Sequence, residues 1–94
     1  MLRALAEPMR WRIVELLAAE QLCVCHLTEL LDASQPLVSH HLRVLREAGL
    51  VEGERYRQWT YYRLRPDTLA ALAGDVASLA ASAPGGASCR RPCC

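Results

Sequence analysis

The sequence predicts a mainly α-helical domain that carries one small β-hairpin. Three observations lead to this fold class. Apolar residues recur at helical spacing between residues 9 and 45, with helix start and stop signals among them. Aromatic and β-branched residues then gather in residues 58–64, as they do in strands. The chain has 94 residues, which is enough for one small domain.

Three helical segments are expected before residue 32. Residues 2–6 form a short fragment that starts abruptly at Met1, and Pro8 opens a second helix at its first position. That helix extends to about Ala19, and a third segment covers residues 23–31. The side chains expected to face the core are Met9, Ile13, Leu16, Leu17, Leu27, Leu30 and Leu31.

Residues 34–49 carry the signals of one short helix at both ends. Ser34 is a favourable N-cap, Pro36 fits the first turn, and Gly49 stands where a C-terminal glycine belongs. One face of this helix is apolar, with Val38, Leu42 and Leu45 inward and His41 at the edge. The other face suits base edges and phosphates of DNA, and it consists of Gln35, Ser39, His40, Arg43 and Arg46. An ordinary solvated face is the alternative.

Two short helices joined by residues 32–33 give a helix-turn-helix pattern. Residues 50–51 and 58–64 follow as a two-stranded antiparallel hairpin, with its tip near Tyr56 and Arg57. A basic hairpin in this position is typical of a wing that reaches phosphates or the minor groove. Its alternative role is a stabilising hairpin with solvated arginines. The net charge is only +1, but residues 40–65 hold six arginines against three acidic residues, which indicates a local anionic partner.

A last helix follows Pro66, with Asp67 or Thr68 as its cap. Its apolar residues are spaced three, four and three apart, a narrow seam that favours packing along the same helix of a second subunit. The seam consists of Leu69, Leu72, Val76 and Leu79. Packing against the chain's own core is the alternative. The sequence thus predicts a homodimeric winged helix-turn-helix domain over residues 1–81 and a flexible, cysteine-containing tail over residues 82–94.

Cysteine usage points to metal or redox chemistry. No stretch resembles a signal peptide or a membrane span, so we expect a cytoplasmic protein with reduced thiols. Clustered cysteines in that compartment favour metals, metalloids or redox switching. Thiolates are soft donors that suit As(III), Sb(III), Cd(II) or Pb(II). The five cysteines are Cys23, Cys25, Cys89, Cys93 and Cys94. Side chains two apart on a regular helix diverge by about 200°, so joint binding by Cys23 and Cys25 is expected to distort the first turn.

Four segments, in this order and spacing, resemble the ArsR–SmtB family of winged-helix, metal-responsive repressors: LAEPMRWRIVELL, CVCHLTELL, SQPLVSHHLRVLREAGLV and RQWTYYRL. The resemblance covers residues 4–64 nearly continuously. It implies a homodimer that binds double-stranded operator DNA and leaves it when an inducer ion binds. The implied DNA-contacting residues are Gln35, Ser39, His40 and Arg43 on the recognition helix, and Arg55 and Arg57 on the wing.

Within this resemblance, residues 23–25 match the CVC box of the arsenic- and cadmium-sensing branches. Arsenite sensors often supply a third thiolate at the position of Thr28, and an acidic residue at the position of His26. The third sulfur is therefore expected from the tail of either subunit, which spans at most about 40 Å when extended. A separate tail site, a two-thiolate site for a methylated arsenical, and His26 as a nitrogen ligand are alternatives, although a solvated His26 is favoured.

The leading interpretation is a repressor that responds to arsenite or antimonite. The alternatives are a Cd(II)- or Pb(II)-responsive repressor that uses Cys23, Cys25 and two tail cysteines, and a repressor switched by thiol oxidation. Zinc or nickel sensing through the last helix is disfavoured because residues 67–81 contain no histidine. We do not expect an enzyme, since the sequence offers no phosphate-cradling loop and no nucleophile–base arrangement.

Overall fold

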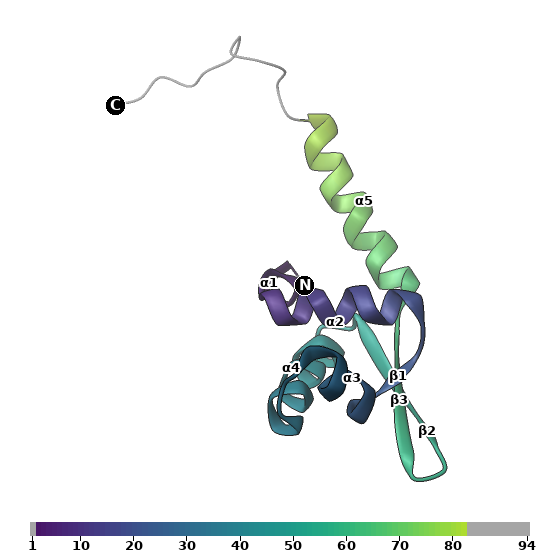
Figure 1. The fold of residues 1–94 in the computed structure, drawn as a ribbon. Helices are drawn as coiled ribbons and strands as arrows, with labels where there is room; N and C mark the ends of the chain where they lie inside the picture. Colours follow the sequence, from purple (N-terminus) through teal and green to yellow (C-terminus); the bar gives the residue numbers. More distant parts are fainter. Residues whose placement is uncertain (1, 83–94) are drawn as a thin grey trace.

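The structure is a computed structural model that describes residues 2–82. This part of the chain folds into five helices and one small antiparallel sheet, which lies at one side of the domain (Figure 1). The helices are α1 (Leu2–Ala6), α2 (Pro8–Ala19), α3 (Val24–Leu31), α4 (Gln35–Glu47) and α5 (Pro66–Ser82). The strands are β1 (Leu22–Cys23), β2 (Val51–Tyr56) and β3 (Trp59–Leu64). The predicted fold class, mainly helical with a helix-turn-helix and a wing, is confirmed.

The core lies where α2, α3 and α4 meet the base of the sheet. Most side chains predicted to face inward do so, because they fall on one side of each helix. Leu30 is an error of prediction: it is 57% exposed, since the short helix α3 packs through Leu27 and leaves the flank with Leu30 uncovered. The most deeply buried side chains are Ile13, Leu27, Val38, Leu42, Leu45, Leu50 and Val51.

The sheet has three strands rather than the predicted two. Their order is β1-β3-β2, and β1 pairs antiparallel with β3 through Leu22↔Tyr62 and Cys23↔Tyr61. A strand of two residues is too short to leave a periodic pattern in the sequence. Cys23 therefore belongs to β1 and precedes α3 as its N-cap residue, whereas the sequence predicted it inside the helix.

The wing is the hairpin of β2 and β3. Its last ladder pair is Tyr56↔Trp59, so the turn consists of Arg57 and Gln58, one residue beyond the predicted tip. Arg57 has φ +58°, in the left-handed region that tight turns require. Strand β2 continues beyond the predicted residues 50–51 to Tyr56. The hairpin projects from the domain on the side away from α5 (Figure 1).

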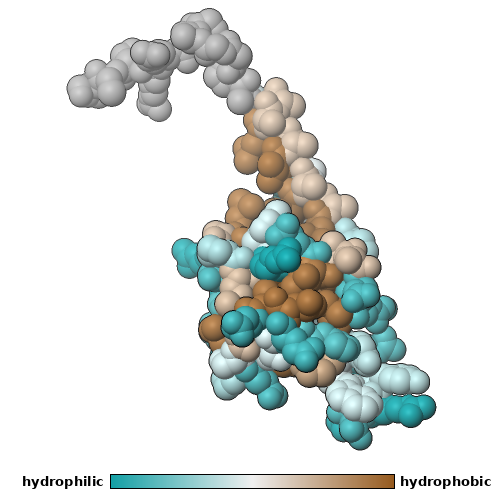
Figure 2. All heavy atoms as spheres, in the orientation of Figure 1, coloured by the Kyte–Doolittle hydropathy of each residue, from teal (hydrophilic) through white to brown (hydrophobic). Residues whose placement is uncertain are grey.

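Helix α5 extends away from the rest of the domain and buries none of its side chains. It begins at Pro66, so the predicted caps Asp67 and Thr68 are wrong and lie in its first turn. Leu69 packs against the core, whereas Val76 is 47% exposed and Leu79 is 70% exposed. Hydrophobic surface is visible along one side of this helix in Figure 2. No helix within residues 2–82 is long and apolar enough to cross a membrane.

Candidate metal centre and nucleic-acid interface

The outer face of α4 is exposed, as predicted. The Leu37 N–H donates to Ser34 Oγ at 3.4 Å, so the helix begins where its cap indicated. Three of the predicted DNA-contacting residues, Ser39, His40 and Arg43, line a shallow cavity of about 360 Å³ together with Arg46 and with Tyr62 of β3. The sequence did not indicate Tyr62, because its position beside α4 depends on the three-stranded sheet. The predicted residues Gln35, Ser39, His40, Arg43 and Arg46 are all exposed.

Ion pairs with acidic residues divide the six arginines of residues 40–65 into two groups. Arg63 forms an ion pair with Glu52 at 2.6 Å, and Arg65 forms one with Asp67 at 3.3 Å. These two were counted as basic in the sequence, but their charge is offset locally. Within residues 2–82, the other four of these arginines have no acidic partner: Arg43, Arg46, Arg55 and Arg57. The unpaired positive charge therefore lies on α4 and at the wing.

His41 of α4 contacts Glu7 and Arg10, which lie where α1 meets α2. It is 7% exposed, more buried than the edge position predicted. Arg10 Nη1 lies 3.4 Å from His41 Nδ1, and Glu7 Oε2 lies 3.9 Å from Nε2. Because a guanidinium only donates, Nδ1 accepts and Nε2 carries the proton. Burial lowers the pKa of His41, the positive charges of Arg10 and His40 lower it further, and Glu7 opposes them.

A pH dependence of stability follows from this lowered pKa of His41. The unfolded chain, with a pKa near the ordinary value of about 6.5, binds more protons than the folded chain as the pH falls through that value. We therefore expect the melting temperature to be lower at pH 5 than at pH 7, and His41→Gln to reduce the difference. Circular dichroism melts from pH 5 to pH 8 measure it. His40→Gln, next to it but exposed, is the control: it removes only the smallest of the causes that lower the pKa of His41 and should keep most of the dependence. If His41→Gln keeps the full dependence, another group is responsible.

Cys23 and Cys25 bring their sulfurs together at the start of α3. The two Sγ atoms are 2.7 Å apart. This approach is possible because Cys23 has an extended backbone, with φ −90° and ψ 169°, and lies before the helix while Cys25 lies in its first turn. The expected divergence of about 200° applies only when both residues are helical. The premise of the predicted distortion, that both cysteines are helical, is therefore wrong.

His26 joins the cysteine pair. Its Nδ1 lies 3.2 Å from Cys23 Sγ and accepts the Cys23 N–H at 3.3 Å. One ligand atom from each of Cys23, Cys25 and His26 falls within 4.8 Å of the others, which is compatible with one bound ion. His26 is exposed, as expected, but it is oriented by this contact. His26 follows the N-cap residue Cys23 by three positions, which is the spacing of a capping box. This spacing is the sequence signal that could have indicated the contact between His26 and Cys23.

The two thiols differ in acidity. Burial opposes ionisation of Cys23, but hydrogen bonds from the Cys25 side chain and from the backbone N–H groups of His26 and Cys25 outweigh it, so the pKa of Cys23 lies below its ordinary value. The hydrogen bond to Cys23, with some desolvation and charge repulsion, raises the pKa of Cys25. Cys23 is therefore the first of the two to ionise, and its sulfur then accepts a hydrogen bond from the Cys25 thiol. Binding of a soft ion would displace the remaining proton.

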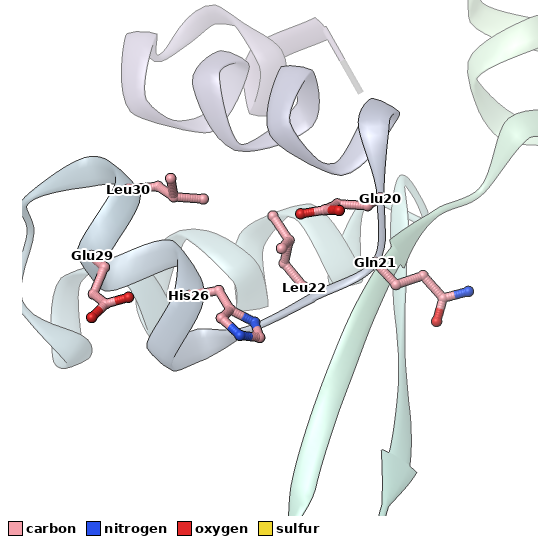
Figure 3. A pocket seen from close by; sticks show the side chains of 6 residues that line it. All are labelled: Glu20, Gln21, Leu22, His26, Glu29 and Leu30. Atoms are coloured by element: carbon pink, nitrogen blue, oxygen red, sulfur yellow. The ribbon is translucent and has the colours of Figure 1, made fainter.

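Two cavities meet at His26. One, of about 210 Å³, opens onto the cysteine pair and is lined by Cys23, Cys25, His26, Trp59 and Tyr61. The other measures about 370 Å³ and is lined by Glu20, Gln21 and Leu22, before and in β1, and by His26, Glu29 and Leu30 of α3 (Figure 3). Within residues 2–82, the metal-type cluster includes neither carboxylate of the second cavity. The predicted ligands Cys89, Cys93 and Cys94 lie outside the described residues.

The fold, the exposed face of α4 and the basic wing together define a winged helix-turn-helix regulatory domain. The chain belongs to the arsR family of bacterial regulatory proteins, whose family model matches residues 7–53. This is a family of regulators, not of enzymes.

Relatives with curated names extend this result. The chain is 50% identical over 66 residues to the arsenic resistance transcriptional regulator ArsR1 of Pseudomonas putida, which covers 69% of this chain and 52% of that protein. It is 46% identical over 65 residues to the arsenical resistance operon repressor of Escherichia coli, covering 68% of this chain and 56% of that protein. It is also 46% identical over 76 residues to the repressor SmtB of Mycobacterium tuberculosis, covering 81% of this chain and 56% of that protein. The chain spans about half the length of these relatives.

Solved structures agree with this fold. A possible transcriptional regulator for arsenical resistance matches with a TM-score of 0.76 and 40% identity, over 88% of this chain and 95% of that one. The regulator HlyU of Vibrio vulnificus matches with a TM-score of 0.69 and 35% identity, over 83% of this chain and 81% of that one.

Proposed function

We propose that the chain is an arsenite- or antimonite-responsive transcriptional repressor that acts in the cytoplasm. It binds operator DNA as a homodimer and leaves it when the thiolates of Cys23 and Cys25 bind trivalent arsenic or antimony. The observation that carries this proposal is the convergence of the two sulfurs, 2.7 Å apart, at the start of the helix that precedes α4. Thiolates are the protein ligands best suited to soft, thiophilic ions. The two relatives named for arsenic resistance support the same reading.

The DNA interface in this proposal combines α4 and the wing. Helix α4 lies in the major groove, where its exposed amide, hydroxyl, imidazole and guanidinium groups meet base edges and phosphates. The wing places two unpaired arginines on the flanking backbone or minor groove. The residues assigned to DNA are Gln35, Ser39, His40, Arg43, Arg55 and Arg57.

Arg57 provides the test of the wing. It lies in the hairpin turn, with its guanidinium carbon 5.5 Å from the centre of the Tyr56 ring. We expect Arg57→Ala to weaken operator binding and to reduce the slope of log affinity against log salt by about 0.9 for each lost phosphate contact. Fluorescence anisotropy of a labelled operator at several salt concentrations measures both. Arg63→Ala is the control, since Arg63 is held by Glu52, and it should leave the slope unchanged. An unchanged slope for Arg57→Ala would show that the wing does not touch phosphate.

Two routes connect the cysteine pair to the DNA-binding elements. Helix α3, which begins at the pair, packs against α4 through Leu27 in the shared core. Cys23 also pairs with Tyr61 of β3, so its backbone is part of the wing sheet. An ion that spreads the sulfurs to ligand distances therefore moves residues bonded to both elements. A coupling of about 1–3 kcal/mol, which is 5- to 150-fold in affinity, is usual for such regulation.

A second candidate function is a Cd(II)- or Pb(II)-responsive repressor of the same fold. His26 favours it, because an imidazole nitrogen beside two thiolates suits divalent cations. Cys23, Cys25 and two tail cysteines would make a four-coordinate site, and one tail cysteine would be enough if His26 also binds. The similarity to SmtB is compatible with this candidate.

Operator release in reducing buffer separates these functions. The full chain is bound to a labelled operator and titrated with arsenite, antimonite, Cd(II) and Pb(II), and then with peroxide in the absence of reductant. The proposal predicts release by arsenite and antimonite at lower concentrations than by the divalent ions. Release by Cd(II) or Pb(II) but not by arsenite would replace it with the second candidate, and release by peroxide alone would indicate a thiol redox switch.

A further inference from the structure

We propose that the cysteine pair takes a trivalent arsenical that carries one organic substituent, and that Trp59 and Tyr61 hold this substituent. The proposal rests on the proposed function, because it names the chemical form of arsenic that the same site would prefer. The repressor mechanism described above uses the backbone pairing of Tyr61 with Cys23 but neither aromatic side chain.

The strand register places two aromatic side chains, Trp59 and Tyr61, beside the sulfurs, and we call these two side chains the aromatic wall. Cys23 is paired directly with Tyr61, so both side chains lie on one face of the sheet. Trp59 lies two residues earlier on β3 and shares this face. Together with Cys25 and His26, these side chains line the cavity of about 210 Å³. An atom held by both sulfurs within this cavity has Trp59 and Tyr61 as the walls across from it.

The cavity has room for a substituent as large as an aromatic ring. Its volume is about 210 Å³, and an apolar cavity of about 150 Å³ is large enough to hold benzene. Trp59 is 44% exposed, so a bound substituent would cover ring surface that faces water. Burial of apolar area and contact between rings both favour an organic group here over a hydroxyl.

The number of thiols in the described site also matches such a ligand. A monosubstituted arsenical, R–As(OH)₂, has two exchangeable positions, whereas arsenite has three. Within residues 2–82 two cysteines converge, and the next residue along the helix face, Thr28, donates its hydroxyl to the Cys25 carbonyl oxygen at 2.8 Å. In the binding step, two As–O bonds break and two As–S bonds form. The two thiol protons leave with the hydroxides as two water molecules, and arsenic stays trivalent.

Direct binding tests the proposal without DNA. Cys89, Cys93 and Cys94 are changed to serine in the full chain, which removes competing thiols, and phenylarsenite, methylarsenite and arsenite are titrated by calorimetry. We expect phenylarsenite to bind about tenfold more tightly than arsenite, as aromatic contacts of this kind predict. In the same background, Trp11→Phe leaves Trp59 as the only tryptophan, and its fluorescence should change on binding phenylarsenite.

Variants of Trp59 and Tyr61 test whether the aromatic wall holds the organic substituent. Trp59→Ala and Tyr61→Leu should each remove most of the preference for phenylarsenite while arsenite binding is kept. Tyr61→Phe, which keeps the ring, should retain the preference, and Trp11→Ala is the control for loss of an exposed tryptophan. Equal affinity for the three arsenicals, or a preference that survives both wall variants, would overturn the proposal. Loss of arsenical binding in the tail-serine background would also overturn it, because the two-thiolate site would then be insufficient.

The proposed function fails by a different result. If Cys23→Ser and Cys25→Ser bind arsenite and phenylarsenite as the parent chain does, the inducer site itself lies elsewhere. If binding needs both cysteines but is indifferent to the substituent, only the aromatic subsite is refuted.

Discussion

Cys23→Ser and Cys25→Ser chains are expected to bind operator DNA with unchanged affinity and to need more than about 100-fold more arsenite for release. Each change removes one of two converging sulfurs, and loss of a direct ligand should exceed the 10- to 100-fold effect that is typical of outer partners of a metal site. DNA affinity is kept because neither side chain lies on the outer face of α4 or at the wing tip. Anisotropy of a labelled operator, with and without arsenite, gives both quantities.

Glu29→Gln is a matched control for this experiment. Glu29 is exposed on the same helix, outside the cluster of Cys23, Cys25 and His26, and its response to arsenite should equal that of the parent chain. If both serine variants release the operator at the parent concentration of arsenite, the sensing site is in the tail and the assignment to α3 is wrong.

A chain with Leu72→Asp and Val76→Asp is expected to be monomeric and to lose operator affinity by more than about 100-fold. Helix α5 packs on the core of its own protomer through Leu69 but has no fully buried side chain, and its apolar seam is 47% exposed at Val76 and 70% exposed at Leu79. Two carboxylates buried in a helix–helix interface would cost several kcal/mol each. A monomer then meets only one half-site and loses the benefit of linked binding. Analytical ultracentrifugation measures the mass, and anisotropy measures the affinity.

The control places the same charges on another face of the helix. At 100° per residue, Ala70 and Ala77 lie more than about 100° from the centre of the seam, and both are exposed. Ala70→Asp with Ala77→Asp should therefore leave the dimer and its operator affinity intact. A stable dimer of the seam variant would mean that the subunits meet through another surface.

Local signals in the sequence were sufficient to predict α4 and the wing. Ser34 and Pro36 act on neighbouring backbone groups, and the aromatic run of β3 is continuous, so neither depends on distant residues. Strand β1 could not be predicted, because two residues carry no period and their pairing with β3 is a tertiary contact. The exposure of Leu30 was missed for a related reason: a helix of eight residues has several apolar faces, and only packing decides which is covered.

The chemistry of the cysteine pair was predicted, but not its geometry. The residue types and their spacing indicated soft-ion binding at Cys23 and Cys25. The convergence of the sulfurs depends on Cys23 belonging to β1, and the orientation of His26 depends on the backbone N–H of Cys23. Arg63 was counted with the free positive charges because its partner Glu52 lies 11 positions away, across the hairpin. Each of these differences comes from strand pairing.

The central claim is that occupation of Cys23 and Cys25 causes release from DNA. Its most direct test measures both events in the same samples: arsenite is titrated into the operator complex, release is followed by anisotropy, and protection of each cysteine from alkylation is followed by mass spectrometry. We predict that protection of Cys23 and Cys25 and release of the operator rise together with the same midpoint. Full release while Cys23 and Cys25 remain open to alkylation, or full protection without release, would contradict it.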